Sequence, residues 1–298
     1  MTETNTCQNG TGASCAAAAP AIAELVRRFE REATQGVCNT GRYRCPYYIW
    51  GQGPPLVFIH GLGDTKRSFL PPIAILSKQF RCIAYDLPTG RRDGAHLRNY
   101  RHADLVKDLF ALLNHLELKK SYVFGSSFGS TIALAAACLE PKRLPRVVLQ
   151  GGFARRPLFP AELLLARVTR FVPGEMRHLP YRERLLQRAH RPPFSERSPE
   201  VWQTFLDWTG ATPISGAAWQ ALILHRVDIR RILPEIRQPV LLLCGDRDPL
   251  ITSAHEDVLL KGLPNAGRII IPGAGHMPSY SHPEMVASIT RDFLTPPP

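Results

Sequence analysis

The chain has 298 residues, of which 44% are hydrophobic, and this is enough apolar surface for a large core in one or two domains. Its formal net charge is +12, but the basic residues are spread along the chain and form no zinc-finger, RNA-binding or basic-heptad motif, so nucleic-acid binding is not predicted. The chain has seven cysteines but no C-x-x-C pair, and it shows no signal-peptide pattern, which indicates a cytoplasmic protein. It has no apolar run of about 20 residues, so no transmembrane segment is predicted.

Residues 1–36 are predicted to form an N-terminal extension. Residues 1–19 are small and polar and are expected to be disordered. After them, apolar residues such as Leu25 and Phe29 recur at helical spacing, and Gly36 is expected to end this helix. The amphipathic helix is predicted to pack on the main domain, and a membrane-surface helix is the alternative.

Residues 37–152 alternate between strand and helix patterns. The run at residues 56–59 is continuously apolar, as is typical of a parallel strand that has helices on both faces. Strands that are joined by helices in this way indicate a mostly parallel sheet. The strands are predicted over residues 43–50, 56–59, 80–85, 121–124 and 146–150, and the helices over residues 69–78, 102–116 and 131 to about 140.

The alternation stops after Gly152. Residues 153–235 contain no convincing strand and hold 13 arginines, no lysine and eight acidic residues. The predicted fold is an α/β-hydrolase-like core formed by residues 37–152 and 236–298, into which residues 153–235 insert as an all-helical cap. Helices are predicted over residues 160–172, 181–190, 199–208 and 215–231 of the cap, and the core resumes with strands over 240–244 and 268–271 and helices over 253–261 and 283–293.

The segment Gly125-Ser126-Ser127-Phe128-Gly129 lies between a predicted strand and a predicted helix. A G-x-S-x-G pattern at such a junction is typical of a nucleophile elbow, in which a strained turn holds the serine hydroxyl clear of the sheet. The glycines two residues before and after the serine allow the strand and the helix to approach closely. Ser127 is the predicted nucleophile, because Ser126 has phenylalanines where the glycines are required.

A serine hydroxyl needs a base within hydrogen-bonding reach, and the base needs an acid that orients it. Both partners are available after later strands. Asp246 and Asp248 follow the predicted strand at residues 240–244, and His276 follows the predicted strand at residues 268–271. Because the carboxyl ends of parallel strands meet at one edge of a sheet, these loops and the elbow are expected to lie together.

Four motifs occur in order at predicted strand ends: His60-Gly61-Leu62-Gly63, Gly125-Ser126-Ser127-Phe128-Gly129, Gly245-Asp246-Arg247-Asp248 and Gly273-Ala274-Gly275-His276. With them the chain resembles the α/β-hydrolase superfamily, and within it the helical-cap serine hydrolases of the esterase-like and C–C-hydrolase-like group. The resemblance covers roughly residues 43–294, and in residues 153–235 it extends only to the presence of a cap. Jointly the motifs are specific for the fold and the catalytic triad, and they do not specify a substrate.

The resemblance implies a role for each residue of the site. Ser127 corresponds to the nucleophile, His276 to the general base and Asp248 to the acid that orients the histidine. The backbone N–H groups of Leu62 and Phe128 correspond to the oxyanion hole, which places partial positive charge where the tetrahedral intermediate becomes negative. No metal and no cofactor are expected in such a site.

Three other residues are alternatives or neighbours of the expected triad. Asp246 is the rival acid, although in the family the first acid of this motif more often has a structural role. His282 is the rival base, but it lies at the start of the closing helix. His60 is expected near the site, where its counterpart in the family usually braces the loop.

The cap carries aromatic residues at helical spacing, and packing within the cap is the favoured role for them. A few should nevertheless face the cleft, and Trp202, Phe205 and Trp219 are the candidate substrate contacts. They indicate a small, mainly apolar acyl or aryl substrate.

The family usually has a compact glycine-rich loop with a serine after the third predicted strand, and here Arg91 and Arg92 occur instead. A solvated loop is the favoured interpretation of these residues, and contact with an anionic substrate group is the alternative. Arg155 and Arg156, at the entrance to the cap, are further candidates for contact with a carboxylate.

Three functions are compatible with the sequence. The leading hypothesis is a serine hydrolase that cleaves a carboxylic ester or a related carbonyl substrate through an acyl-enzyme. The same triad also suits hydrolysis of a C–C bond or acyl transfer to an acceptor other than water. The third hypothesis is a receptor-like, ligand-binding hydrolase fold with little turnover. The oligomeric state is not predicted.

Overall fold

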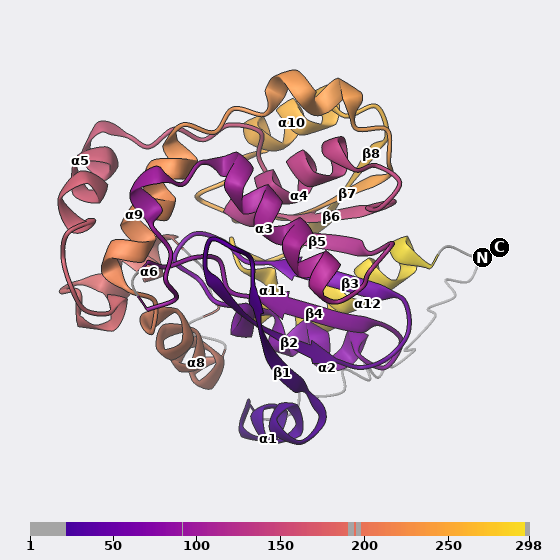
Figure 1. Cartoon of the computed structure of the whole chain (residues 1–298), viewed down its shortest axis with the longest axis horizontal. Coiled ribbons are helices and arrows are strands. Elements are labelled where there is room, and N and C mark those ends of the chain that lie inside the picture. Colours follow the sequence, from indigo (N-terminus) through magenta and orange to yellow (C-terminus); the bar gives the residue numbers. More distant parts are fainter. Residues whose placement is uncertain (1–21, 91, 190–193, 195–197, 296–298) are drawn as a thin grey trace, which may run out of the picture.

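The computed structural model describes residues 22–90, 92–189, 194 and 198–295, so the predicted disorder of residues 1–19 lies outside the described residues. Within these ranges, the strands form one eight-stranded sheet in the order β1-β2-β4-β3-β5-β6-β7-β8 (Figure 1). β2 is antiparallel to its neighbours β1 and β4, and all other neighbouring strands are parallel, which confirms the predicted fold class. The strands are β1 (Thr34–Asn39), β2 (Arg44–Trp50), β3 (Pro55–Ile59), β4 (Arg81–Tyr85), β5 (Tyr122–Ser126), β6 (Val147–Gln150), β7 (Val240–Gly245) and β8 (Ala266–Ile271).

Helices cover both faces of this sheet. Along β3, Val57 and Ile59 belong to the core on one face and Leu56 and Phe58 to the core on the other, because successive side chains of a strand alternate. All four are fully buried, which explains why this strand is continuously apolar. The first face is covered by α3 (His102–His115), α4 (Phe128–Leu139) and α10 (Ser253–Gly262), and the second by α1 (Ile22–Glu32), α2 (Leu70–Leu76) and α12 (Pro283–Leu294).

The predicted N-terminal helix is present as α1, and it packs on the sheet. The ring of Phe29 lies 4.9 Å from that of Tyr48 and 5.8 Å from that of Trp50, and the Trp50 indole N–H donates to Glu32 at 3.0 Å. These contacts favour the packing role over a membrane-surface helix. The prediction that Gly36 ends the helix was wrong, because this residue lies within β1. β1 was missed since its side chains are mostly exposed and show no apolar alternation.

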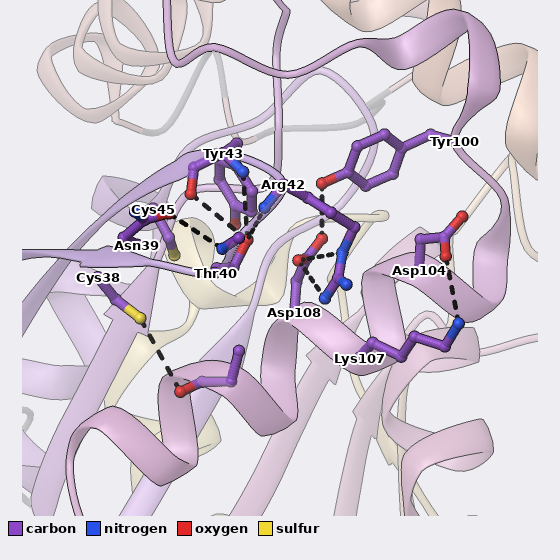
Figure 2. Close-up of polar contacts among 12 residues, drawn as sticks. Cys38, Asn39, Thr40, Arg42, Tyr43, Cys45, Tyr100, Asp104, Lys107 and Asp108 are labelled. Atoms are coloured by element: carbon purple, nitrogen blue, oxygen red, sulfur yellow. Dashed lines mark hydrogen bonds and ion pairs between the residues drawn. The ribbon is translucent and has the colours of Figure 1, made fainter.

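A buried carboxylate ties the turn between β1 and β2 to α3 (Figure 2). The Asp108 side chain is only 1% exposed and accepts hydrogen bonds from Arg42 Nε at 2.8 Å and from the Tyr100 hydroxyl at 2.9 Å. Burial raises the pKa of Asp108 above its ordinary value, while these donors act in the opposite direction. The network fixes the edge of the sheet against the helix that leads into the elbow strand.

The predicted cap, residues 153–235, falls in the segment between β6 and β7, which we call the helical insertion, and the described helices of this segment lie at one end of the molecule (Figure 1). In its described part, the only β-type pairing is an isolated bridge between Glu175 and Pro213. The last predicted helix, over residues 215–231, ends earlier than expected, because the Ile229 N–H donates to the Ala154 carbonyl at 3.0 Å and not to its own helix. The helices of the insertion are α5 (Pro160–Thr169), α6 (Arg182–Ala189), α8 (Pro199–Gly210) and α9 (Ile214–His225), followed by a 3₁₀ helix (Arg230–Glu235).

Candidate active site

The nucleophile elbow forms where β5 passes into α4. Ser127 adopts φ 50° and ψ −116°, a conformation that costs a residue with a side chain about 1–3 kcal/mol. A Cβ atom on Gly125 would lie 2.6 Å from the Gly129 carbonyl oxygen, and one on Gly129 would lie 2.2 Å from the Ile59 carbonyl oxygen. Both glycines are therefore required for the strand and the helix to approach, as the motif predicts.

The structure brings Ser127, His276 and Asp248 into one hydrogen-bonded chain. His276 Nε2 lies 3.0 Å from Ser127 Oγ, and His276 Nδ1 lies 2.7 Å from Asp248 Oδ2. The His276 and Asp248 side chains are 5% and 3% exposed, whereas Ser127 is partly exposed. A partly exposed hydroxyl on a buried, oriented histidine is the geometry that serine activation requires.

Asp248 is held in its ionised form by its surroundings. Burial opposes ionisation, but the neighbouring His276 and the backbone N–H groups of Leu250 and Ile251 outweigh it, so the pKa of Asp248 lies below its ordinary value. The two N–H groups donate to Oδ1 at 2.8 and 2.9 Å, which leaves Oδ2 for the histidine. The carboxylate is thereby fixed in position as well as in charge.

The two rival residues have other partners. Asp246 Oδ1 accepts the Gly273 N–H at 2.7 Å and so joins the loops that follow β7 and β8. His282 lies at the N-cap of α12, where its Nδ1 contacts the Ser281 hydroxyl at 2.8 Å. The geometry therefore favours Asp248 and His276 over these alternatives.

The loop after β3 lies beside the nucleophile. A Cβ atom on Gly61 would lie 3.2 Å from Ser127 Cβ, so the backbone of this loop faces the serine. Phe128 is the first residue of α4, and N–H groups in the first turn of a helix have no partner within the helix. Leu62 directly follows Gly61 and Phe128 directly follows Ser127, and the oxyanion-hole role of their N–H groups stays a prediction.

His60 braces this loop, as the resemblance implies. Its Nε2 accepts the Leu87 N–H at 2.9 Å, so the proton of the neutral ring is on Nδ1, which donates to the Gly61 carbonyl at 2.8 Å. The ring is fully buried. It joins the loops that follow β3 and β4 and does not contact the candidate triad through these bonds.

Gln220 of α9 connects the helical insertion to both of these loops, and the sequence interpretation missed it. The residue is fully buried; its Oε1 accepts the Gly63 N–H at 2.9 Å, and its Nε2 donates to the Pro88 carbonyl at 3.2 Å. Gly63 directly follows Leu62, the candidate oxyanion donor. The signal that could have identified Gln220 is a lone amide in the otherwise apolar run around Trp219 and Leu222.

We expect the substitution Gln220→Leu to lower kcat by about 10- to 100-fold, because a displaced donor is costly at an oxyanion hole. It should also lower the free energy of unfolding by about 1–3 kcal/mol, since two buried backbone groups lose their partners. Steady-state kinetics and urea unfolding measure the two effects. Gln203→Leu is the matched control, because Gln203 is exposed on α8, where its amide donates to Asp207 at 3.0 Å. Unchanged kcat in the Gln220 variant would contradict the positioning role.

A second buried amide, Gln150, connects the elbow to the segment after His276. Gln150 Nε2 donates to the Ser126 hydroxyl at 3.0 Å, and its Oε1 accepts the Ser279 N–H at 3.1 Å. It ends the otherwise apolar strand β6, and a polar residue at that edge of the sheet is the signal that was overlooked. The network holds the histidine loop in register with the nucleophile.

Gly151 provides the space that the histidine ring occupies. Its φ is +55°, and a Cβ atom there would lie 2.9 Å from His276 Cε1 and 3.5 Å from Asp248 Oδ2. We expect Gly151→Ala to reduce kcat by about 10²-fold, because a shift of about 1 Å in a reacting group has this effect. Gly267→Ala on β8 is the control, since no atom lies within 4 Å of its added Cβ. Equal kcat values for the two variants would show that the ring position is not critical.

Two of the three aromatic candidates for substrate contact, Trp202 and Phe205, pack against each other, and Trp219 packs against a different core cluster. Trp202 and Phe205 are 6% and 2% exposed, and their rings lie 5.3 Å apart in a cluster with Phe194 and Tyr280. Trp219 has the Arg170 guanidinium 5.2 Å from its ring centre. The contacts of Trp202 and Phe205 favour packing between the insertion and the segment after His276 over a direct substrate contact, whereas for Trp219 a substrate contact stays a prediction.

The arginine candidates have protein partners. Arg92 pairs with Glu175 at 2.8 Å, Arg155 with Asp228 at 3.6 Å and Arg156 with Glu162 at 3.3 Å, whereas Arg91 lies outside the described residues. The pairs favour a structural, solvated role for these side chains over contact with a substrate anion.

Within the described ranges, no group of His, Cys, Asp and Glu side chains is arranged to hold a metal ion. No described helix is long and apolar enough to cross a bilayer.

Comparison with known proteins agrees with this architecture. Residues 54–283 match the family described as alpha/beta hydrolase fold. The chain is 26% identical over 248 residues to the dihydrolipoyllysine-residue acetyltransferase component of the acetoin cleaving system of Pseudomonas putida, a match that covers 81% of this chain but only 64% of that protein. It is 27% identical to a poly(3-hydroxyalkanoate) depolymerase of Ectopseudomonas oleovorans, over 80% of this chain and 84% of the relative.

Among solved structures, the enol-lactonase from Burkholderia xenovorans superposes with a TM-score of 0.78 at 25% identity, and the match covers 88% of this chain and 99% of that one. The family match spans most of the chain and includes β3, the elbow and both loops that carry Asp248 and His276. The chain therefore belongs to the α/β-hydrolase family of enzymes.

Proposed function

We propose that this protein is a serine hydrolase that cleaves a carboxylic ester or a related carbonyl substrate through an acyl-enzyme. The observation that carries the proposal is the continuous hydrogen-bonded chain from Ser127 through His276 to Asp248, with distances of 3.0 and 2.7 Å. A small substrate with an apolar acyl or aryl group is the proposed class. The helical insertion is proposed to act as the cap that selects it.

In the first half of the reaction, Ser127 Oγ attacks the carbonyl carbon while its proton moves to His276 Nε2. Asp248 holds the proton of the neutral ring on Nδ1, so that Nε2 is free to accept, and it stabilises the charged imidazolium that forms. The imidazolium then gives its proton to the departing alcohol, and the C–O bond breaks. The acyl group remains on Ser127.

In the second half, His276 takes a proton from water while the water oxygen attacks the acyl carbon. The bond between the acyl carbon and Ser127 Oγ then breaks, His276 returns the proton to Oγ, and the carboxylic acid leaves. The backbone N–H groups of Leu62 and Phe128 would bind the oxyanion in both halves, and each donor of this type is worth about 10²–10³ in kcat. Two similar proteins, a poly(3-hydroxyalkanoate) depolymerase and an enol-lactonase, are named for ester-type substrates, which supports this choice of bond.

Two measurements test the proposal. A fluorophosphonate probe should label the wild-type protein at Ser127, and a panel of esters, lactones and vinylogous ketones should identify the bond that is cleaved. Ester turnover with a rapid initial burst is the expected result. Transfer to an added alcohol in preference to water, or cleavage of a C–C bond, would support the acyltransferase or C–C hydrolase alternative. A protein that neither reacts with the probe nor turns over esters would instead fit the ligand-binding hypothesis.

A reducing, cytoplasmic location forms part of the proposal. Cys38 and Cys45 are register partners across the β1–β2 hairpin, and both are free thiols. Antiparallel register partners have Cα atoms about 4.5–5.5 Å apart, which lies within the range that disulfides span. Alkylation of both thiols in freshly lysed cells, followed by mass spectrometry, checks this location, and recovery of the pair as a disulfide would count against it.

A further inference from the structure

α5 presents an apolar face to solvent. Leu164, Leu165 and Val168 are 63%, 59% and 58% exposed, and Phe171, just beyond the helix, is 72% exposed. Residues at spacings of one, four and seven lie on one side of a helix, so these four side chains form a single face. A surface helix ordinarily turns such a face toward the core, and α5 does the reverse.

The core-facing side of α5 is narrow. Ala166 is its buried residue, and α9 lies between α5 and the sheet (Figure 1). We call Leu164, Leu165, Val168 and Phe171 the outer face. Contiguous exposed apolar surfaces of this kind mark sites of interaction with proteins or membranes.

Positive charge borders the outer face. Arg167 is exposed on the same helix, and the Arg170 guanidinium lies 4.5 Å from the ring centre of Phe171. Neither arginine has a carboxylate within 4.0 Å among the described residues. The helical insertion as a whole carries 13 arginines and eight acidic residues, so its formal charge is also positive. The partner of this surface is therefore expected to be both apolar and anionic.

We propose that the outer face docks onto an anionic lipid bilayer. A bilayer interface accepts a convex helix with leucine, valine and phenylalanine on one side and arginine beside them, to a depth of about 5–10 Å. A second copy of this chain fits less well, because self-association would bring the arginines of one insertion against those of the other. The inference concerns binding alone and does not depend on the proposed ester hydrolysis.

Sedimentation with vesicles tests the proposal without measuring turnover. Wild-type protein should sediment with phosphatidylcholine vesicles that contain phosphatidylglycerol and remain in solution with pure phosphatidylcholine. The combined variant Leu164→Ser, Val168→Ser and Phe171→Ser should lower the partition coefficient by about 100-fold, through loss of buried apolar area. Arg167→Glu should lower it by about tenfold, through the reversed charge at an anionic surface.

Leu139→Ser is the matched control. Leu139 is 66% exposed, as are the residues of the outer face, but it ends α4 at the opposite end from Ser127 and lies outside the insertion. This variant should bind vesicles as the wild type does. The proposal is overturned if the wild type binds neither kind of vesicle, if it binds both equally, or if the triple variant binds like the wild type. A wild-type dimer that the triple variant converts to a monomer in lipid-free solution would assign the face to a second copy instead.

Discussion

Replacing Ser127 with alanine is expected to lower kcat by about 10⁶-fold, because the oxygen that forms the acyl-enzyme is removed and the remaining groups cannot replace it. KM should change little, since the methyl group leaves the surrounding backbone in place. The structure makes this the largest expected effect, as Ser127 is the only member of the candidate triad that would form a covalent bond. Hydrolysis of the best ester from the panel provides the assay.

The matched control for this variant is Ser288→Ala, on α12, whose hydroxyl contacts Asp292 at 3.4 Å and lies outside the candidate site. It should retain full activity. Fluorophosphonate labelling should disappear in the Ser127 variant and persist in the control. Retention of most activity by Ser127→Ala would mean that another group starts the reaction, and the acyl-enzyme mechanism would have to be abandoned.

The second largest effect is expected for Asp248→Asn, with kcat reduced about 10⁴-fold. An asparagine amide placed toward His276 would donate to Nδ1, which forces the ring proton onto Nε2 and removes the acceptor that Ser127 needs. Asp246→Asn is the control that separates the two acids of the motif. Its side-chain oxygen would still accept the Gly273 N–H, so only a small loss is expected. A larger loss in the Asp246 variant would reverse the assignment of the orienting acid.

The pH dependence of stability follows from the lowered pKa of Asp248. A carboxyl whose pKa is lower in the folded than in the unfolded protein stabilises the fold above its unfolded pKa, about 3.9 for aspartate, and loses this contribution as the pH falls through the folded pKa. The difference in unfolding free energy between wild type and Asp248→Asn should therefore be constant at mildly acidic and neutral pH and shrink at lower pH. Urea unfolding at a series of pH values measures it.

Much of the fold could be predicted from local patterns in the sequence. The apolar run of β3 is continuous because both faces of that strand are buried. The elbow could be identified because only glycine at positions 125 and 129 allows β5 and α4 to approach each other. The positions of Asp248 and His276 followed from the rule that parallel strands end at one edge of a sheet. β1 was not predicted, because an exposed edge strand carries no apolar alternation to identify it.

The supporting residues of the site could not be predicted in the same way. Gln150 and Gln220 are ordinary amides in the sequence, and their importance depends on partners far away along the chain: Ser279 in one case, and Gly63 and Pro88 in the other. Gly151 could be recognised as a turn residue, but the need for its missing Cβ arises from the His276 ring. Such contacts exist only once distant segments have packed together.

The sequence by itself determined the elements, the order of the motifs and the chemical types of the candidate nucleophile, base and acid, because these depend on residue identity and short-range spacing. The motif already favoured Asp248 over Asp246 as the orienting acid, and the structure has Asp248 against the histidine. The tertiary structure alone decided that Trp202 and Phe205 are buried in a cluster and that the apolar side of α5 faces outward. Burial and exposure are decided by which surfaces meet, and a helical apolar stripe has the same spacing whichever way it is turned.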